Sequence, residues 1–159
     1  MSPMKIQHLA IKKIITGLAG IIFTLTISSS VFSQGVGIDI TTPNTKLDIN
    51  GDIALRIGSY TAGGTNNNIA IGTSSFVRLS GPTGAYSISG VSGGVNGKIV
   101  ILYNSTSYDL FINHESGSSV AANRIWCSDN ASKTIKSKGC ASLIYSSTDN
   151  RWILFSNTL

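Results

Sequence analysis

Short apolar runs alternate with turn residues along the chain from Gln34 onward. The runs are rich in Ile, Val, Tyr, Phe and Trp, the side chains that favour extended backbone. No stretch of about ten residues carries apolar side chains at helical spacing without Gly, Asn or Ser clusters between them. This pattern predicts an all-β protein in which helix is a minor element. The expected strands are 46–49, 53–57, 75–79, 86–88, 98–103, 108–113, 124–127, 134–136, 141–145 and 151–155.

Turn residues between these runs predict how some of the strands connect. Asn50-Gly51 and Asn96-Gly97 supply residues that tolerate positive φ, as tight hairpin turns require. Asp149-Asn150 is expected to close the last hairpin. Adjacent strands joined in this way run antiparallel, so the sequence predicts an antiparallel sheet.

Two of the expected strands, 99–103 and 152–155, are apolar at nearly every position rather than at alternate ones. Successive side chains of a strand point to opposite faces, so such a strand is covered on both sides. One face can pack inside a two-layer domain. Cover for the other face requires a further layer or another subunit, and this predicts an oligomer.

The first 33 residues differ from the rest in having a basic start followed by an apolar run. Lys5, Lys12 and Lys13 precede the run 14–27, which is shorter than the roughly 20 apolar residues of a membrane-spanning helix. This is typical of a signal helix, and the small side chains before Gln34 predict cleavage there. A secreted or cell-surface protein is therefore expected. An uncleaved anchor is the alternative.

Removal of that segment changes the charge balance of the protein. Three of its 12 basic residues are lost, which leaves nine against seven acidic residues. The remaining bases are mostly single, although Lys133, Lys136 and Lys138 lie close together. No basic stripe follows that could neutralise a run of phosphates, so nucleic acid is not an expected partner.

Composition divides the mature chain into two parts. Residues 34–72 are rich in Gly, Thr and Asn and predict an extended, mostly irregular stalk. Residues 73–159 contain most of the expected strands and predict a head domain. The head is expected to be a small antiparallel β-sandwich, or a jelly-roll-like variant of one.

Two stretches of the mature chain combine short apolar runs with characteristic turn residues. The first consists of Gly35-Val36-Gly37, Thr42-Pro43-Asn44 and 46–52, and the second of 76–83, 88–90, 93–98, Asn113, 115–116, 121–125, 143–145 and Arg151-Trp152. Together they resemble phage tail-fibre-like proteins and exported fibre-like β proteins of Bacteroidota, with the second stretch similar to their C-terminal β-sandwich domain. The resemblance implies a trimer with a surface-exposed recognition end and no catalytic residues. Phage fibres carry no signal peptide, so a cellular, exported relative fits better.

Both cysteines, Cys127 and Cys140, lie in the mature part of the chain. An exported protein meets an oxidising compartment, where two cysteines tend to be joined, so a disulfide between them is predicted. Two buried free thiols are the alternative.

Two pairs of polar residues are candidates for ligand contact. His114 is the only histidine after the signal segment, and with Glu115 it could bind a metal or act as acid and base. Adjacent residues on a strand point to opposite faces, however, so a solvated loop is the alternative. Asp129 and Asn130 lie in a polar loop that could bind a sugar or a cation, and here too simple solvation is the alternative.

Aromatic side chains could stack on sugar rings. Tyr60 and Tyr108 lie near predicted turns and are the better candidates for exposure. Trp126 and Trp152 lie within predicted strands and are expected in the core or at a subunit interface.

Motifs of catalysis and of cofactor binding do not occur in the mature sequence. No serine elbow, calcium loop or phosphate-binding loop is present, so we expect no enzyme activity, cofactor or metal. The expected function is that of an exported, trimeric, fibre-like module that binds a surface glycan or protein receptor. The alternative is a monomeric secreted carbohydrate-binding module.

Overall fold

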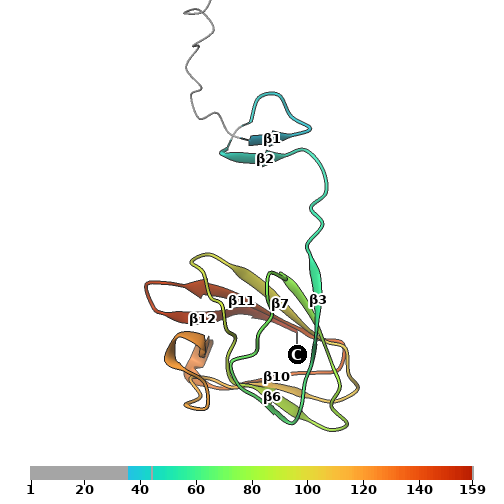
Figure 1. Ribbon diagram of the computed structural model, residues 1–159, viewed down its shortest axis with the longest axis vertical. Helices are drawn as coiled ribbons and strands as arrows, with labels where there is room; N and C mark the ends of the chain where they lie inside the picture. The colour runs from blue at the N-terminus through green and yellow to red at the C-terminus, as the bar shows by residue number, and fades with distance from the viewer. Residues whose placement is uncertain (1–35, 44, 159) are drawn as a thin grey trace, which may run out of the picture. The chain divides into compact units, whose positions relative to one another are not determined.

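The computed structural model describes residues 36–43 and 45–158, which fall into two units divided between Ile53 and Ala54. The predicted signal helix and its cleavage site lie outside the described residues. The described part of the first unit contains a pair of short strands, β1 (Val36–Ile38) and β2 (Leu47–Ile49). These strands run parallel, with Val36 in register with Leu47 (Figure 1).

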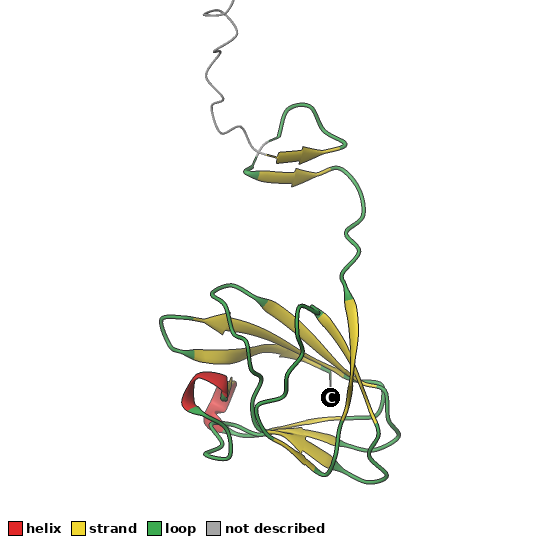
Figure 2. Cartoon of the chain, viewed as in Figure 1, coloured by secondary structure: helices red, strands yellow, loops and turns green. Residues whose placement is uncertain are grey.

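The second unit is built from strands arranged in two sheets (Figure 1, Figure 2). The six-stranded sheet has the order β3-β5-β7-β11-β12-β9, and the four-stranded sheet the order β10-β8-β6-β4. Its strands are β3 (Ile57–Thr61), β4 (Thr65–Asn66), β5 (Phe76–Ser80), β6 (Tyr86–Ile88), β7 (Ile99–Asn104), β8 (Leu110–Ile112), β9 (Ile125–Cys127), β10 (Lys133–Ile135), β11 (Cys140–Ser146) and β12 (Arg151–Asn157). Helix in the described residues is limited to the 3₁₀ turns η1 (Ala121–Asn123) and η2 (Ser128–Asn130), in agreement with the all-β prediction. None of these described helices is long and apolar enough to cross a membrane.

From β3 to β8 the chain passes alternately between the two sheets. β3, β5 and β7 lie side by side in one sheet and β4, β6 and β8 in the other, and all of these neighbours are parallel. The result is a solenoid-like coil in which each turn contributes one strand to each sheet. Gly81, with φ of +108°, lies at a corner where an added Cβ would come within 2.9 Å of the Ala62 carbonyl oxygen of the preceding turn.

The last part of the chain adds antiparallel strands to the coil. β10 pairs with β8, and β11 pairs with both β7 and β12, all antiparallel. β9 then pairs in parallel with β12. The prediction of an antiparallel sheet is therefore wrong for the first half of the unit and right for only part of the second. Parallel coils form there because the turns lead into the opposite sheet instead of back along the same one.

The boundary predicted after residue 72 also differs from the structure. The compact unit begins at Ala54, because β3 and β4 pair with β5 and β6 and are integral to the two sheets. The segment that contains β3 and β4 is rich in Gly and Asn and lies within the predicted stalk. In the structure it forms the first turn of the coil.

The core lies between the two sheets and follows the alternation of each strand. Val100 and Leu102 of β7 and Leu143 of β11 are fully buried from one sheet, and Ile88 and Leu110 from the other. Trp152 is the largest of the fully buried side chains, and its Nε1–H donates to the carbonyl of Val91 at 2.7 Å. Tyr145 packs edge-on against it, with ring centroids 5.2 Å apart.

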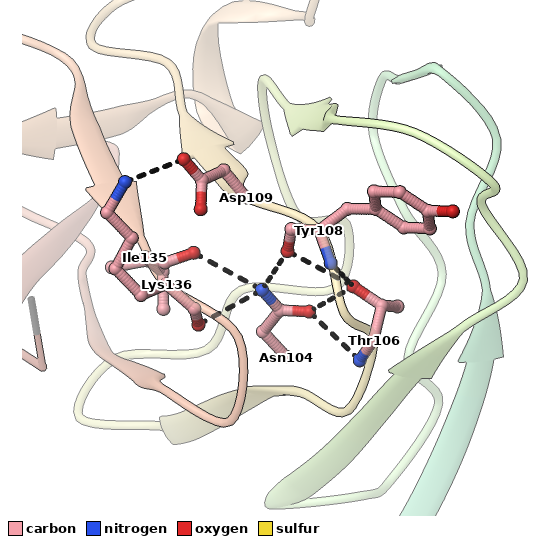
Figure 3. Close-up of polar contacts among 6 residues, drawn as sticks. All are labelled: Asn104, Thr106, Tyr108, Asp109, Ile135 and Lys136. Atoms are coloured by element: carbon pink, nitrogen blue, oxygen red, sulfur yellow. Dashed lines mark hydrogen bonds and ion pairs between the residues drawn. The ribbon is translucent and has the colours of Figure 1, made fainter.

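A buried asparagine connects the two sheets at one end (Figure 3). Asn104, at the end of β7, is inaccessible to solvent, and its Nδ2 donates to the carbonyls of Tyr108, Ile135 and Lys136 at 2.8 to 3.2 Å. Its Oδ1 accepts hydrogen bonds from the Tyr86 hydroxyl at 2.8 Å and from the Thr106 hydroxyl at 2.7 Å. Burial raises the pKa of Tyr86 to about 12, which keeps the hydroxyl protonated as a donor.

Replacement of Asn104 is expected to destabilise the second unit strongly. Asn104→Ala leaves the Tyr86 hydroxyl and three carbonyls without their partner, and we expect a loss of about 3 kcal/mol in the free energy of unfolding. Tyr86→Phe, which removes one hydroxyl from the same network, should cost only about 1 kcal/mol. Urea titration of both variants measures the difference. Equal losses in the free energy of unfolding would show that the hydrogen bonds from Asn104 to the three carbonyls do not stabilise the unit.

Candidate functional site

The described residues contain a surface cavity of about 230 Å³ beside β9 and β12. It is lined by the residues Trp126, Cys127, Ser128, Asp129, Asn130, Ile153 and Leu154. Trp126 and Ile153 are in register on neighbouring strands, and η2 supplies Ser128, Asp129 and Asn130. An apolar floor and a polar turn thus meet at this cavity.

The polar turn is held in an uncommon backbone conformation. Asp129 and Asn130 have φ of 60° and 56°. These values lie in the left-handed region of the backbone, which residues other than Gly, Asn and Asp seldom adopt. Lys133 Nζ donates to both carboxylate oxygens of Asp129, at 2.6 and 2.7 Å. The hydrogen bond from Lys133 lowers the pKa of Asp129, so this carboxylate stays ionised.

His114 lies next to this turn and is fixed by hydrogen bonds of its own. Its Nδ1 accepts the Cys127 backbone N–H at 3.1 Å, and its backbone N–H donates to Ser132 Oγ at 3.0 Å. His114 is also close enough to Asp129 to contribute to the lowering of its pKa. The structure therefore brings three of the predicted contact residues, His114, Asp129 and Asn130, to one end of β9.

Glu115 does not share this site with His114. Its Oε1 accepts Arg151 Nε at 2.6 Å, and this hydrogen bond raises the pKa of Arg151. The φ of Glu115 is 43°. The carboxylate is thus engaged in an ion pair with β12, and Glu115 lies in a turn with left-handed backbone rather than on an extended strand.

The two predicted tyrosines lie elsewhere. Tyr60 is in β3, at the opposite edge of the six-stranded sheet from β9, and it packs partly buried against the core. The expectation that Tyr60 is exposed is wrong, since alternation along β3 turns its ring inward. Tyr108 is 41% exposed, as predicted, in the loop between β7 and β8.

Trp126 and Ile153 were not among the predicted contact residues, although both line the cavity. Trp126 is 42% exposed, while its neighbours Ile125 and Cys127 are buried. Alternation along β9 provides the signal, because Ile125 in the core requires Trp126 to point outward. Alternation along β12 likewise places Trp152 in the core, where the sequence analysis expected it.

The predicted disulfide does not form, and both cysteines are free thiols. Cys127 is in register with Leu154, which is in register with Leu143 on β11. Cys140 lies three residues before Leu143 and two strands away from Cys127, so strand geometry separates the two Cα atoms by about 14 Å. A disulfide requires Cα atoms no more than about 7 Å apart.

Within the described residues, no three side chains of His, Cys, Asp or Glu are grouped closely enough to hold a metal ion. The polar groups at the cavity can offer hydrogen bonds and one negative charge, and Trp126 can offer a stacking surface.

No family model, curated protein or solved structure matches this chain.

Reaction with a thiol reagent tests the assignment of the cysteines. Burial raises the pKa of Cys127 to about 11 and also raises that of Cys140, which is less buried. At pH 8 we expect Cys140 to be modified first and Cys127 at least tenfold more slowly, because the thiolate is the reactive form. Two thiols should react in denaturant without reductant.

Cys140→Ser is the matched control for this experiment. In that variant the remaining thiol, Cys127, should react slowly in the folded protein and rapidly once the protein is unfolded. A denatured wild-type chain with no reactive thiol would instead establish the disulfide.

Proposed function

We propose that the protein is an exported, non-catalytic structural or adhesive module of the fibre-like kind, assembled as a trimer and secreted or held at the cell surface. Three copies present their loops together to a surface glycan or protein. Weak sites joined in this way gain affinity through effective concentration, so no single site has to be strong.

The observation that carries the proposal is the exposure of aliphatic side chains between residues 36 and 57. Their exposed fractions lie between 47% and 69%, and the residues are Val36, Ile38, Leu47, Ile53, Leu55 and Ile57. Ile53, Leu55 and Ile57 are spaced two apart, with Ala54 and Arg56 between them. Within the second unit, Leu55 and Ile57 are therefore separated by a single residue, Arg56.

These exposed aliphatic side chains cost free energy as long as they face water. A single chain leaves it open in the described residues. Equivalent segments of several copies, laid side by side, would cover one another, as in the trimeric β structure that the sequence resembles. The predicted export signal supports this proposal, because a fibre of this kind acts outside the cell.

Light scattering on the eluting protein, recovered after export and measured without reductant, tests the assembly. We expect three times the mass of one chain, because the aliphatic segment is covered only in the oligomer. The double variant Ile53→Ser, Leu55→Ser should dissociate at lower dilution than the wild type. A wild-type protein with the mass of one chain over the whole concentration range would refute the fibre assignment.

One observation favours a second candidate, a monomeric secreted carbohydrate-binding module. Trp126 presents part of its indole beside Asp129 and Asn130, and an exposed aromatic ring next to polar side chains is a suitable surface for a sugar ring. The cavity is small and suits one sugar unit.

A glycan array with variants of the cavity tests this second candidate. If a sugar stacks on the indole, Trp126→Ala should lower the binding signal at least tenfold, since stacking is the main apolar contact at the cavity. Phe111→Ala is the matched control, because Phe111 is also exposed, at 39%, but lies on the four-stranded sheet. Wild-type protein that binds no glycan, or equal losses in both variants, would exclude this site.

A further inference from the structure

Asparagine followed directly by glycine occurs twice in the chain, at Asn50-Gly51 and at Asn96-Gly97. This dipeptide is chemically labile in water, because glycine has no Cβ to keep its backbone nitrogen away from the preceding side-chain amide. Both pairs were expected to form turns with positive φ. The structure places them in contrasting surroundings, and the contrast indicates which of them is free to react.

The fold of the second unit uses both residues of Asn96-Gly97. Gly97 has φ of +77°, a conformation that glycine adopts without strain. Its N–H donates to the carbonyl of Tyr145 at 2.9 Å, and Asn96 Oδ1 accepts the Ser147 N–H at 3.0 Å. The backbone nitrogen and the side-chain amide of this pair are therefore each held by another partner.

Asn50-Gly51 has no comparable structural role. Neither residue has a positive φ, so the turn expected here is not a left-handed one. A Cβ added to Gly51 would meet no heavy atom within 4 Å, and the Gly51 N–H has no hydrogen-bond partner among the described residues. Neither the backbone conformation nor the packing thus requires glycine at residue 51.

The side chain of Asn50 is exposed and weakly held. Its Nδ2 donates to the carbonyl of Asp39 at 3.4 Å, which is longer than a usual N–H···O hydrogen bond. The backbone N–H of Asn50 donates to the carbonyl of Ile38 at 3.0 Å. The chain is therefore fixed before Asn50, whereas the Asn50 amide and the Gly51 nitrogen can turn towards each other.

We propose that Asn50-Gly51 is a site of spontaneous chemical modification. The Gly51 nitrogen attacks Asn50 Cγ, the bond between Cγ and Nδ2 breaks, and the amide group leaves as ammonia with the proton of the Gly51 N–H. The resulting cyclic imide is then opened by water at one of its two carbonyl carbons. One product has aspartate at residue 50. The other has isoaspartate, in which the main chain runs through the side-chain carbons. Water is the only other reactant.

Either product adds one negative charge to the described part of the first unit. The acidic residues of this part, Asp39, Asp48 and Asp52, already outnumber its one basic residue, Lys46. Isoaspartate also lengthens the main chain by one carbon directly after β2. The modification therefore changes both the charge and the path of the chain where it leaves this pair of strands.

The new charge also bears on the proposed assembly. Residue 50 lies in sequence between Leu47 and Ile53, two of the exposed aliphatic residues that copies of the chain are proposed to cover. Copies that each gain a carboxylate there bring like charges together, and this disfavours association. The effect on assembly rests on the proposed function, whereas the modification itself follows from the local geometry.

Mass spectrometry of the full chain kept at pH 8 tests the proposal. Cleavage after lysine and arginine gives the peptide 47–56, whose only asparagine is Asn50, and the peptide 79–98, whose only asparagine is Asn96. In the folded protein we expect the acid form to accumulate at least tenfold faster in 47–56 than in 79–98, because reaction at Asn96 first requires two hydrogen bonds to open. In urea the two peptides should convert at similar rates, since no fold then protects Asn96.

Gly51→Val is the matched variant. The open space and the ordinary φ at residue 51 accept the valine side chain, while its branched Cβ hinders the attack of the backbone nitrogen. Conversion at Asn50 should fall at least tenfold and conversion at Asn96 should stay unchanged. The proposal is overturned by equal rates at Asn50 and Asn96 in the folded wild type, or by a Gly51→Val chain that converts at Asn50 like the wild type.

Light scattering on fresh and aged protein separates this inference from the proposed function. An oligomer that dissociates more readily after ageing in the wild type, but not in Gly51→Val, supports the effect on assembly. An oligomer that is indifferent to conversion at Asn50 overturns that effect. A wild-type monomer refutes the proposed assembly and leaves the modification site standing.

Discussion

The second unit depends on closing each turn of its coil, because the chain must leave one sheet and enter the other without burying unpaired backbone groups. Two buried asparagines perform this task at corners of the coil. Asn66 accepts the Gly63 N–H at 2.8 Å and donates to the carbonyls of Gly63 and Ser87. Asn104 does the same for a larger set of partners on β10 and on the loop that follows β7. With these corners satisfied, no buried side-chain nitrogen or oxygen in the described residues lacks a partner. The remaining inward positions of the coil can then be occupied by apolar side chains.

The sequence predicted the strands from β5 onward well, but the expected strand 53–57 is irregular up to residue 56, β1 and β4 were not predicted, and strand directions were predicted poorly. Apolar side chains at the inward positions of β5, β7, β11 and β12 mark these strands clearly, and Asp149-Asn150 does connect the antiparallel pair β11 and β12. Asn96-Gly97, expected to close a hairpin, forms instead a turn before β7. In that turn Asn96 Oδ1 accepts the Ser147 N–H, and the Gly97 N–H donates to the carbonyl of Tyr145. The same turn residues serve a hairpin and a corner of a coil, so only distant pairing distinguishes the two.

The parts of the candidate site that depend on local sequence could be predicted. The parts that depend on which strands pair with one another could not. Asp129 and Asn130 tolerate left-handed backbone, so an exposed polar turn could be anticipated at these residues. The cavity also requires Ile153, which approaches Trp126 only because β9 pairs in parallel with β12. The prediction of a disulfide between Cys127 and Cys140 was wrong for a related reason. Their separation of 13 positions in sequence does not reveal that β12 lies between β9 and β11 in the sheet and keeps the two thiols apart.

Strands with apolar side chains on both sides leave some of their outer side chains exposed in the second unit. One side of β7 packs in the core, and on the other side Ile99 is 47% exposed while Ile101 is half-buried. A monomeric binding module would gain by replacing these residues with polar ones, since exposed aliphatic side chains on a flat sheet favour aggregation. Their spread over neighbouring strands, far from the cavity in the case of Ile57, is not explained by a sugar site. Trp126 alone suits either use. Assembly would cover exposed aliphatic side chains both on this sheet and between residues 36 and 57, and for this reason we propose assembly ahead of sugar binding.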